Sequence, residues 1–283
     1  MFASGLLAGK RILVTGGGTG LGRAMVQRFL ELGAQAAICG RRSEVLAATK
    51  LELEQTTGGS VETHVCDVRD VEAVEAMIAQ LWERGPLDVL VNNAAGNFIS
   101  RTEDLSPRAV EAVLRIVLHG TVNVTLACGK RWLAEEHRAT VLSISTTYAR
   151  TGSGFVVPSA MAKAGVDAMT KSLAAEWGGR GIRFVGIAPG PFKTEGAFSR
   201  LMPLERLEKS ALERVPLRRF GELGELTDLA AYLVSERAAY INGDIVTIDG
   251  GESLAGAGEF NALGALVSDA EWEMIKPKKT PPR

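Results

Sequence analysis

The stretch Thr15-Gly-Gly-Gly-Thr-Gly-Leu-Gly22 decides the fold. It follows the apolar run 11–15, which predicts a buried strand, and leads into 22–32, an amphipathic helix pattern that Gly33 ends. Glycine at a strand-to-helix turn lets the backbone approach a pyrophosphate, which binds at the helix N-terminus. The sequence therefore predicts a dinucleotide-binding turn made by Gly16, Gly17, Gly18, Thr19, Gly20 and Leu21.

Strand and helix patterns alternate along the rest of the chain, which predicts βαβ units and a parallel sheet. We expect a single-domain α/β fold over residues 1–283, a doubly wound Rossmann-type sheet of about seven strands flanked by helices. Ser43 is expected to cap the second helix, and separate helices are expected at 106–116 and 120–136. Further strands are predicted at 35–39, 61–66, 88–92, 140–144, 182–187 and 244–248, and further helices at 43–56, 71–84, 158–177, 226–235 and 268–275.

Two segments lie outside this alternation. The long excursion at about 189–218 follows a strand end, and long loops in compact domains are usually lids or binding loops, so we expect a substrate lid. The tail at about 252–283 ends in the basic run 276–283, which is most simply a disordered end, with a partner site as the alternative.

Composition bounds the class of protein. The chain has 283 residues, 46% of them hydrophobic, and a net charge of -1, which suits a globular core and gives no electrostatic footprint for nucleic acid. Cys39, Cys66 and Cys128 lie in apolar segments at unrelated spacings and are expected to be reduced core residues. The three histidines are scattered without metal-ligand spacing, so no metal site is expected.

Targeting signals are not evident. The apolar patch before Lys10 and Arg11 lacks the ordered regions of a signal peptide, and no apolar run approaches the roughly 20 residues of a membrane span. The final Pro-Pro-Arg is not a peroxisomal address. We therefore expect a cytoplasmic location and no membrane partner.

The residues after the second strand bear on the choice of nicotinamide cofactor. An acidic residue there would hold a ribose 2′-hydroxyl and repel a 2′-phosphate, but the chain reads Cys39-Gly-Arg-Arg42. Arginine offers paired donors to a phosphate, so Arg41 favours NADP. The alternative is that both arginines are a solvated approach to the next helix.

A second informative stretch runs from Tyr148 to Lys163. It places a tyrosine after the predicted strand 140–144 and a lysine in the first turns of the next helix. In an open α/β sheet, ligands bind at the carboxyl ends of the strands. Tyr148 is the only one of three tyrosines in such a place, which makes it a candidate catalytic residue.

This stretch resembles the short-chain dehydrogenase/reductase family, with one departure. Most members carry Tyr-x-x-x-Lys at the helix start, whereas this chain reads Ser159-Ala-Met-Ala-Lys163 and has its tyrosine upstream on the expected loop, at Tyr148. Together with Asn92-Asn-Ala-Ala-Gly-Asn-Phe98 and Pro189-Gly-Pro-Phe-Lys-Thr-Glu-Gly-Ala-Phe-Ser-Arg200, the chain looks like the mitochondrial type of 2,4-dienoyl-CoA reductase within that family. The resemblance spans about 13–272.

The resemblance implies roles for the catalytic and cofactor-binding residues. Tyr148 and Asn97 lie beside the substrate thioester, and both side chains can donate hydrogen bonds to an oxygen that becomes negative. Lys163 holds the nicotinamide ribose, and Ser159, too weak an acid to replace the family tyrosine, orients the site. Asp67 contacts the adenine, and the remaining cofactor residues are Asn93, Ala95, Pro189, Gly190, Pro191 and Phe192.

Substrate contacts also follow from the resemblance. Phe98 and Ser106 are expected to line the pantetheine path, and Arg200 to bind a phosphate of coenzyme A. Arg41 and Arg69 could share the remaining phosphates. Exposed arginines are common, so the alternative for each is a plain surface residue. His119 lies where many members have asparagine, and a structural role is expected.

The expected activity is NADPH-dependent reduction of 2,4-dienoyl-CoA to 3-enoyl-CoA in unsaturated fatty acid degradation. A carbonyl (3-oxoacyl-type) reductase of the same family and a non-catalytic NADP-binding sensor are the alternatives. The helices beginning at Gly120 and Pro158 resemble the family's subunit interface, which implies a homotetramer.

Overall fold

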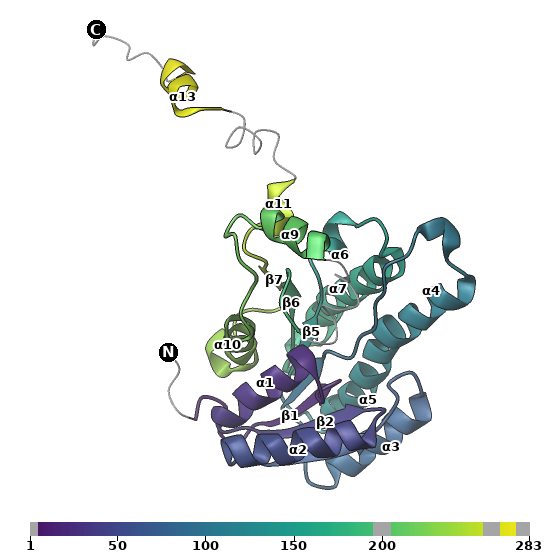
Figure 1. Ribbon diagram of the computed structural model, residues 1–283. Coiled ribbons are helices and arrows are strands. Elements are labelled where there is room, and N and C mark those ends of the chain that lie inside the picture. Colours follow the sequence, from purple (N-terminus) through teal and green to yellow (C-terminus); the bar gives the residue numbers. More distant parts are fainter. Residues whose placement is uncertain (1–4, 195–204, 257–266, 276–283) are drawn as a thin grey trace.

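Seven parallel strands form one sheet in the order β3-β2-β1-β4-β5-β6-β7 (Figure 1). The computed structural model describes residues 5–194, 205–256 and 267–275. The order reverses between β1 and β4, so the crevice expected of a doubly wound sheet lies above the ends of these two strands. The strands are β1 Arg11–Thr15, β2 Gln35–Gly40, β3 Val61–Val65, β4 Val89–Asn92, β5 Ala139–Ile144, β6 Ile182–Pro189 and β7 Ile245–Ile248.

Helices connect the strands and cover both faces of the sheet (Figure 1). The long ones are α1 Gly20–Glu31, α2 Ser43–Thr57, α3 Val71–Trp82, α4 Pro107–Leu114, α5 Gly120–Ala134, α7 Val157–Trp177, α9 Glu205–Arg214 and α10 Leu223–Val234. The short ones are η1 Thr102–Asp104, η2 Arg115–His119, α6 Tyr148–Thr151, η3 Gly178–Arg180, η4 Glu236–Ala238, α11 Glu252–Ala255 and α13 Asp269–Ile275. This arrangement confirms the predicted α/β fold class.

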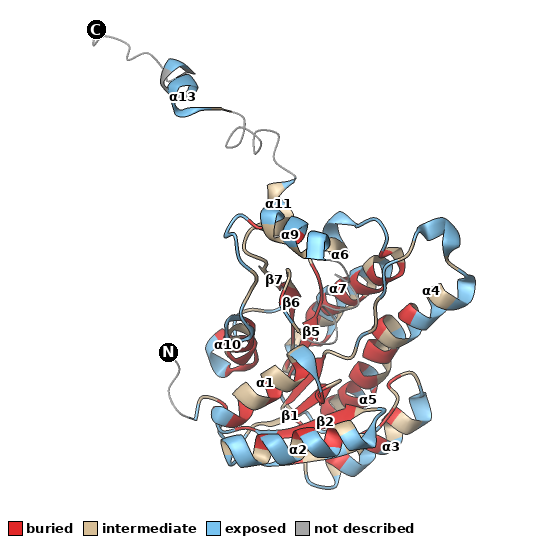
Figure 2. Cartoon of the chain, viewed as in Figure 1, coloured by how far each residue is buried: buried red, intermediate tan, exposed pale blue. Residues whose placement is uncertain are grey.

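The central strands β1, β4, β5 and β6 are buried on both sides because helices cover both faces of the sheet there. In β1, Ile12 and Val14 pack with α1, α2 and α10, whereas Leu13 between them packs with α3, α5 and α7. The period of two along a strand produces this alternation. Figure 2 shows the result, with buried residues concentrated in the strands and on the inward faces of the helices.

Local structure corrects three details of the sequence prediction. The N-cap of α2 is Arg42, and Ser43 is the first helical residue, so Ser43 is not the cap. Tyr148 does not lie on a loop but begins the one-turn helix α6. The helices expected on either side of Gly120 are joined by η2, a π-helical turn, into one run, Pro107–Ala134.

That run is also long and apolar enough to cross a membrane by length and composition. Half of its most apolar window is buried within the protein. All three cysteines are free and buried, and burial raises the pKa of the Cys39 thiol to about 12. The cysteines are therefore core residues, as predicted.

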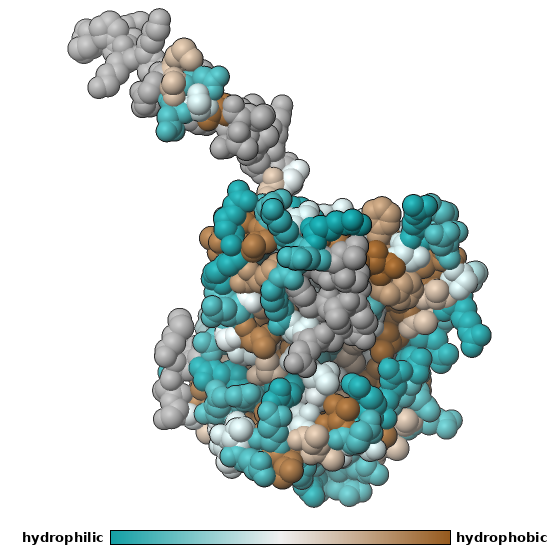
Figure 3. Space-filling view, in the orientation of Figure 1, coloured by the Kyte–Doolittle hydropathy of each residue, from teal (hydrophilic) through white to brown (hydrophobic). Residues whose placement is uncertain are grey.

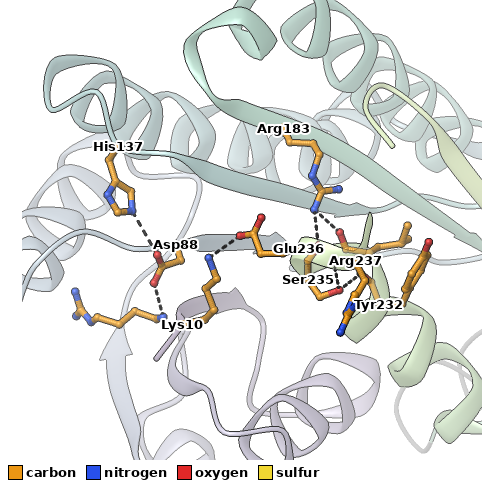
Figure 4. Close-up of polar contacts among 10 residues, drawn as sticks. Lys10, Asp88, His137, Arg183, Tyr232, Ser235, Glu236 and Arg237 are labelled. Atoms are coloured by element: carbon orange, nitrogen blue, oxygen red, sulfur yellow. Dashed lines mark hydrogen bonds and ion pairs between the residues drawn. The ribbon is translucent and has the colours of Figure 1, made fainter. Parts of the chain in front are cut away.

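The amino-terminal edge of the sheet is closed by polar contacts (Figure 4). Lys10 forms an ion pair with Glu236 at 2.9 Å, and Arg183 of β6 donates to the carbonyl oxygen of Leu233 at 2.6 Å. Asp88, just before β4, accepts a hydrogen bond of 2.8 Å from the amide of Arg11. These groups satisfy one another, whereas the carboxyl edge of the sheet is hollowed into a cavity.

Candidate active site

The turn between β1 and α1 is built so that only glycine fits at several positions. Gly16 has a φ of +65°, in the region that side chains rarely adopt. A Cβ on Gly17 would lie 2.5 Å from Cγ2 of Ile38, and one on Gly22 would lie 2.5 Å from the side-chain nitrogen of Asn93. The turn therefore lies directly against β2 and β4.

Two threonines that were not predicted as site residues, Thr15 and Thr49, hold this turn in place. The hydroxyl oxygen of Thr15 accepts hydrogen bonds of 3.0 Å from the backbone amides of Asn93 and Ala94, which joins the ends of β1 and β4. The hydroxyl of Thr49 in α2 donates to the carbonyl oxygen of Gly18 at 2.8 Å. A buried threonine at a strand end was the available signal for Thr15.

A cavity of about 480 Å³ lies above the carboxyl ends of β1, β4, β5 and β6. It brings together all of the predicted cofactor-binding residues except Gly17, whose role is to pack against Ile38. The lining includes Gly16, Gly18, Thr19, Gly20, Leu21, Arg41, Asp67, Asn93, Ala95, Lys163, Pro189, Gly190, Pro191 and Phe192. Thr194, Ile116 and Val68 also line it and were not predicted.

The cavity has the features that a nicotinamide dinucleotide requires. Thr19 is the N-cap residue of α1, and its side chain makes no hydrogen bond to the first helical turn. The backbone amides of that turn therefore remain free to bind an anionic group such as a pyrophosphate. Arg41 is exposed on the rim at the end of β2, where a ribose 2′-phosphate would lie. Asp67 accepts a hydrogen bond of 2.9 Å from Nε of Arg69, and this pairing lowers the pKa of the Asp67 carboxyl.

Three predicted catalytic side chains meet at the other end of the cavity. The amide nitrogen of Asn97 donates to the hydroxyl of Tyr148 at 3.2 Å, and that hydroxyl lies 3.2 Å from the hydroxyl of Ser159. The backbone amide of Phe98 donates to Oδ1 of Asn97 at 2.9 Å, which fixes the amide with its NH₂ group toward Tyr148. Asn97 and Tyr148 can therefore donate to one oxygen atom between them, and Ser159 positions the tyrosine.

Lys163 is buried on α7, one turn beyond Ser159, and its ammonium group donates to the carbonyl oxygen of Ile144. Burial lowers its pKa to about 8, and the carboxylate of Asp167 opposes this fall. Asp167, one turn further along α7, accepts a hydrogen bond from the hydroxyl of Ser145, and its own pKa is raised by burial. Asp167 and Ser145 were not predicted; an acidic residue on the inner face of α7 was the available signal.

Three of the predicted substrate residues, Ser106, Arg69 and Phe98, do not line the cavity. Ser106 is the N-cap of α4 and accepts a hydrogen bond of 3.1 Å from the amide of Ala109. Arg69 is paired with Asp67, and Phe98 is partly exposed beside Asn97. Arg200 lies outside the described residues. The roles of these four residues in substrate binding remain predictions.

Two further expectations concern His119 and metal ions. His119 is exposed at the end of η2 and does not line the cavity, so the expected structural role remains a prediction. Within the ranges that the structure describes, no group of three or more histidine, cysteine, aspartate or glutamate side chains is arranged to hold a metal ion.

Comparison with known proteins places this fold and site in a family. A family model described as "Enoyl-(Acyl carrier protein) reductase" matches residues 16–253. The chain belongs to the short-chain dehydrogenase/reductase family. It is therefore an oxidoreductase of a family that binds a nicotinamide cofactor.

Relatives in this family include named dienoyl-CoA reductases. A Caenorhabditis elegans protein named "Probable 2,4-dienoyl-CoA reductase 3", described as producing (3E)-enoyl-CoA, is 45% identical over 88% of this chain and 82% of its own. A Bacillus subtilis (strain 168) protein named probable 2,4-dienoyl-CoA reductase, described as producing (2E)-enoyl-CoA, is 42% identical over 87% of this chain and 97% of its own.

Solved structures agree with the fold. A short chain dehydrogenase from Bacillus anthracis is 42% identical, with a TM-score of 0.81 over 88% of this chain and 98% of the other. A gluconate 5-dehydrogenase from Burkholderia cenocepacia, solved with NADP and tartrate, is 29% identical, with a TM-score of 0.84 over 89% of this chain and 98% of the other. The short-chain dehydrogenase/reductase fold inferred from the sequence is confirmed.

Proposed function

We propose that this short-chain dehydrogenase/reductase is an NADPH-dependent 2,4-dienoyl-CoA reductase that forms 3-enoyl-CoA. The observation that carries the proposal is the position of the tyrosine hydroxyl, which lies between the amide of Asn97 and the hydroxyl of Ser159. Two relatives that are 42% and 45% identical to the chain are named as probable 2,4-dienoyl-CoA reductases.

The arrangement suits reduction of a carbon–carbon double bond conjugated to a thioester. Such a reaction places negative charge on the thioester oxygen and ends with the carbonyl restored, so that oxygen needs hydrogen-bond donors more than a proton. Tyr148 and Asn97 supply two donors, and the buried Lys163 ammonium adds positive potential nearby. Bound NADPH supplies the hydride, which the dienoyl group accepts at its δ-carbon.

The proposed product follows from the groups around the substrate. The described residues that line the cavity include no carboxyl group beside Tyr148 that could protonate carbon. We therefore propose that water protonates the α-carbon of the dienolate, which gives 3-enoyl-CoA. The two relatives above are described as giving different isomers, so product identity must be measured for this chain.

The preference for NADPH rests on the cavity rim. Arg41 and Arg42 line the cavity next to the end of β2, and both side chains are exposed. No carboxylate follows β2 to hold a ribose 2′-hydroxyl, and a guanidinium group there complements a 2′-phosphate.

We also propose that the chain assembles as a homotetramer through α5 and α7. Leu126 of α5 is 39% exposed and Met161 of α7 is 47% exposed, which is consistent with apolar helix faces that a second copy would cover.

An absorbance assay of NADPH oxidation tests the proposed function. The purified protein is mixed with NADPH and, in separate reactions, with a 2,4-dienoyl-CoA, a 2-enoyl-CoA or a 3-oxoacyl-CoA. The dienoyl ester is expected to be the good substrate. Reduction of the 3-oxoacyl ester alone would establish a carbonyl reductase instead, and binding of NADPH without turnover of any ester would indicate a sensor.

A further inference from the structure

Exposed apolar side chains lie on two loops beside the pair of hydrogen-bond donors. Ile99, on the loop after β4, is 43% exposed, and Phe155, between α6 and α7, is 61% exposed. The backbone amide of Ser100 donates to the carbonyl oxygen of Phe155 at 2.9 Å, so the two loops are joined. Ile99 and Phe155, called the apolar rim below, therefore belong to one surface.

This surface is continuous with the proposed catalytic donors. The rim begins two residues after Asn97, and Phe98 between them orients the amide of Asn97 through its backbone. Phe155 lies four residues before Ser159 on the segment that also carries Tyr148. In Figure 3, apolar atoms gather near the upper end of α7, on the face where these loops run.

The backbone holds Phe155 in a conformation that is rare for a side chain of its size. Its φ is +67°, in the left-handed region that favours glycine. The next residue, Val156, is buried, and its carbonyl oxygen accepts from the amides of Ser159 and Ala160 at 3.0 Å. The segment is thus anchored at Val156 while the phenyl ring remains in solvent. Such strain concentrates at binding and catalytic sites.

We propose that Ile99 and Phe155 bind the fatty acyl chain of the substrate and that Phe155 sets the preference for chain length. This inference rests on the proposed function, because it takes the thioester to lie at Tyr148 and Asn97. An acyl chain that extends from the thioester along the two joined loops would contact the apolar rim. That contact would bury the side chains of Ile99 and Phe155. Each buried methylene group then adds to affinity.

Binding measurements test this inference separately from the proposed activity. Hexanoyl-, octanoyl- and decanoyl-CoA are titrated calorimetrically into the full-length protein with NADP⁺ present. For the wild type, affinity is expected to rise with chain length, by up to about fourfold for each methylene group that contacts the rim. In Phe155→Ala and Ile99→Ala the rise is expected to flatten, so that decanoyl-CoA loses about tenfold in affinity while hexanoyl-CoA loses less than about twofold.

Two further variants serve as controls. Phe155→Leu keeps an apolar side chain and should retain most of the dependence on chain length. Tyr240→Ala removes a fully exposed aromatic ring that does not line the cavity and should bind all three esters as the wild type does.

Several results would overturn the inference. One is a dependence on chain length that is the same in the wild type and in Phe155→Ala. Another is an equal loss of affinity for all three esters, which would mean that Phe155 contacts the pantetheine. A third is a change of oligomeric state in Phe155→Ala with the dependence unaltered, which would assign the rim to a subunit contact. A further outcome is that the wild type reduces no dienoyl ester while its affinity for acyl-CoA still rises with chain length and Phe155→Ala flattens that rise. In that case the proposed function fails, but the inference that the apolar rim binds an acyl chain stands.

Discussion

The side-chain amide of Asn97 donates a hydrogen bond of 3.2 Å to the hydroxyl of Tyr148, although 51 positions separate the two residues along the chain. Asn97 follows β4, and Tyr148 follows β5, the neighbouring strand. Parallel pairing of these strands brings the residues that follow them to one edge of the sheet. The two hydrogen-bond donors are therefore a direct product of sheet topology.

The first prediction separates the two hydroxyl groups of the site. Tyr148→Phe removes the donor that faces the thioester oxygen and should cost about 2.7–4 kcal/mol of transition-state stabilisation, mainly in kcat. Ser159→Ala removes only a neighbour of that donor and should cost clearly less. Steady-state kinetics with a dienoyl-CoA measure both, and an equal or greater loss in Ser159→Ala would show that the donor is misassigned.

The second prediction concerns the cofactor. Arg41→Asp removes a phosphate partner from the cavity rim and adds a negative charge, so the ratio of kcat/KM for NADPH to that for NADH should fall to one or below. Arg108→Asp, at an exposed arginine of α4 that does not line the cavity, is the matched control and should leave this ratio unchanged. Equal use of both cofactors by the wild type would contradict the assignment of Arg41.

The third prediction is a pH dependence that follows from the buried lysine. The pKa of Lys163 is lowered to about 8 by burial, so its positive charge is present below that pH and lost above it. The rate should therefore fall as pH rises through about 8. Asp167→Asn removes the carboxylate that opposes the lowering, so the alkaline limb should move to lower pH.

A profile of kcat/KM against pH, with NADPH saturating, makes this measurement. The charged groups that act on the carboxyl of Asp167 are Arg150 of α6 and Lys163 and Lys171 of α7, and each favours its ionised form. Asp167→Glu keeps a carboxylate at this position of α7 and serves as the control, whose alkaline limb should stay near that of the wild type. If Asp167→Asn lowers kcat/KM equally at every pH and the alkaline limb stays at the same pH, Asp167 has a purely structural role.

The fourth prediction concerns stability of the glycine turn. Gly17→Ala places a methyl group 2.5 Å from Cγ2 of Ile38 inside a packed core and should lower the free energy of unfolding by about 1–3 kcal/mol. Gly224→Ala, in the first turn of α10 with no atom within 4 Å of the added methyl group, should leave it unchanged or slightly raised. Urea denaturation measures the free energy of unfolding of both variants. Equal values for Gly17→Ala and Gly224→Ala would contradict the packing described for Gly17.

Periodicity predicted the strands and most helices well because the central strands are buried on both faces and the segments between strands repeat with helical spacing. It separated two helices, 106–116 and 120–136, but the π-helical turn η2 joins them. Gly120 allows a close approach there, because a Cβ would lie 2.5 Å from Cγ2 of Val68. The expected cap at Ser43 was wrong because Arg42 is the last extended residue and Ser43 is already helical, so Arg42 occupies the cap position.

The site could be predicted only as far as its residues follow strand ends or match family motifs. Tyr148, Asn97 and Lys163 were found in this way. Thr15 and Asp167 were not, because their roles arise from hydrogen bonds and charges across neighbouring elements, which spacing along one segment does not reveal.

A competition experiment tests the central claim most directly. Equal concentrations of a 2,4-dienoyl-CoA and a 3-oxoacyl-CoA of the same length are incubated with the protein and limiting NADPH, and the products are separated by mass spectrometry. In this account Tyr148 and Asn97 donate to the thioester oxygen, and Ser159 stands where most family members have the tyrosine that protonates a ketone. We therefore expect nearly all of the NADPH to be consumed in forming 3-enoyl-CoA. A product that is mainly 3-hydroxyacyl-CoA would contradict the account.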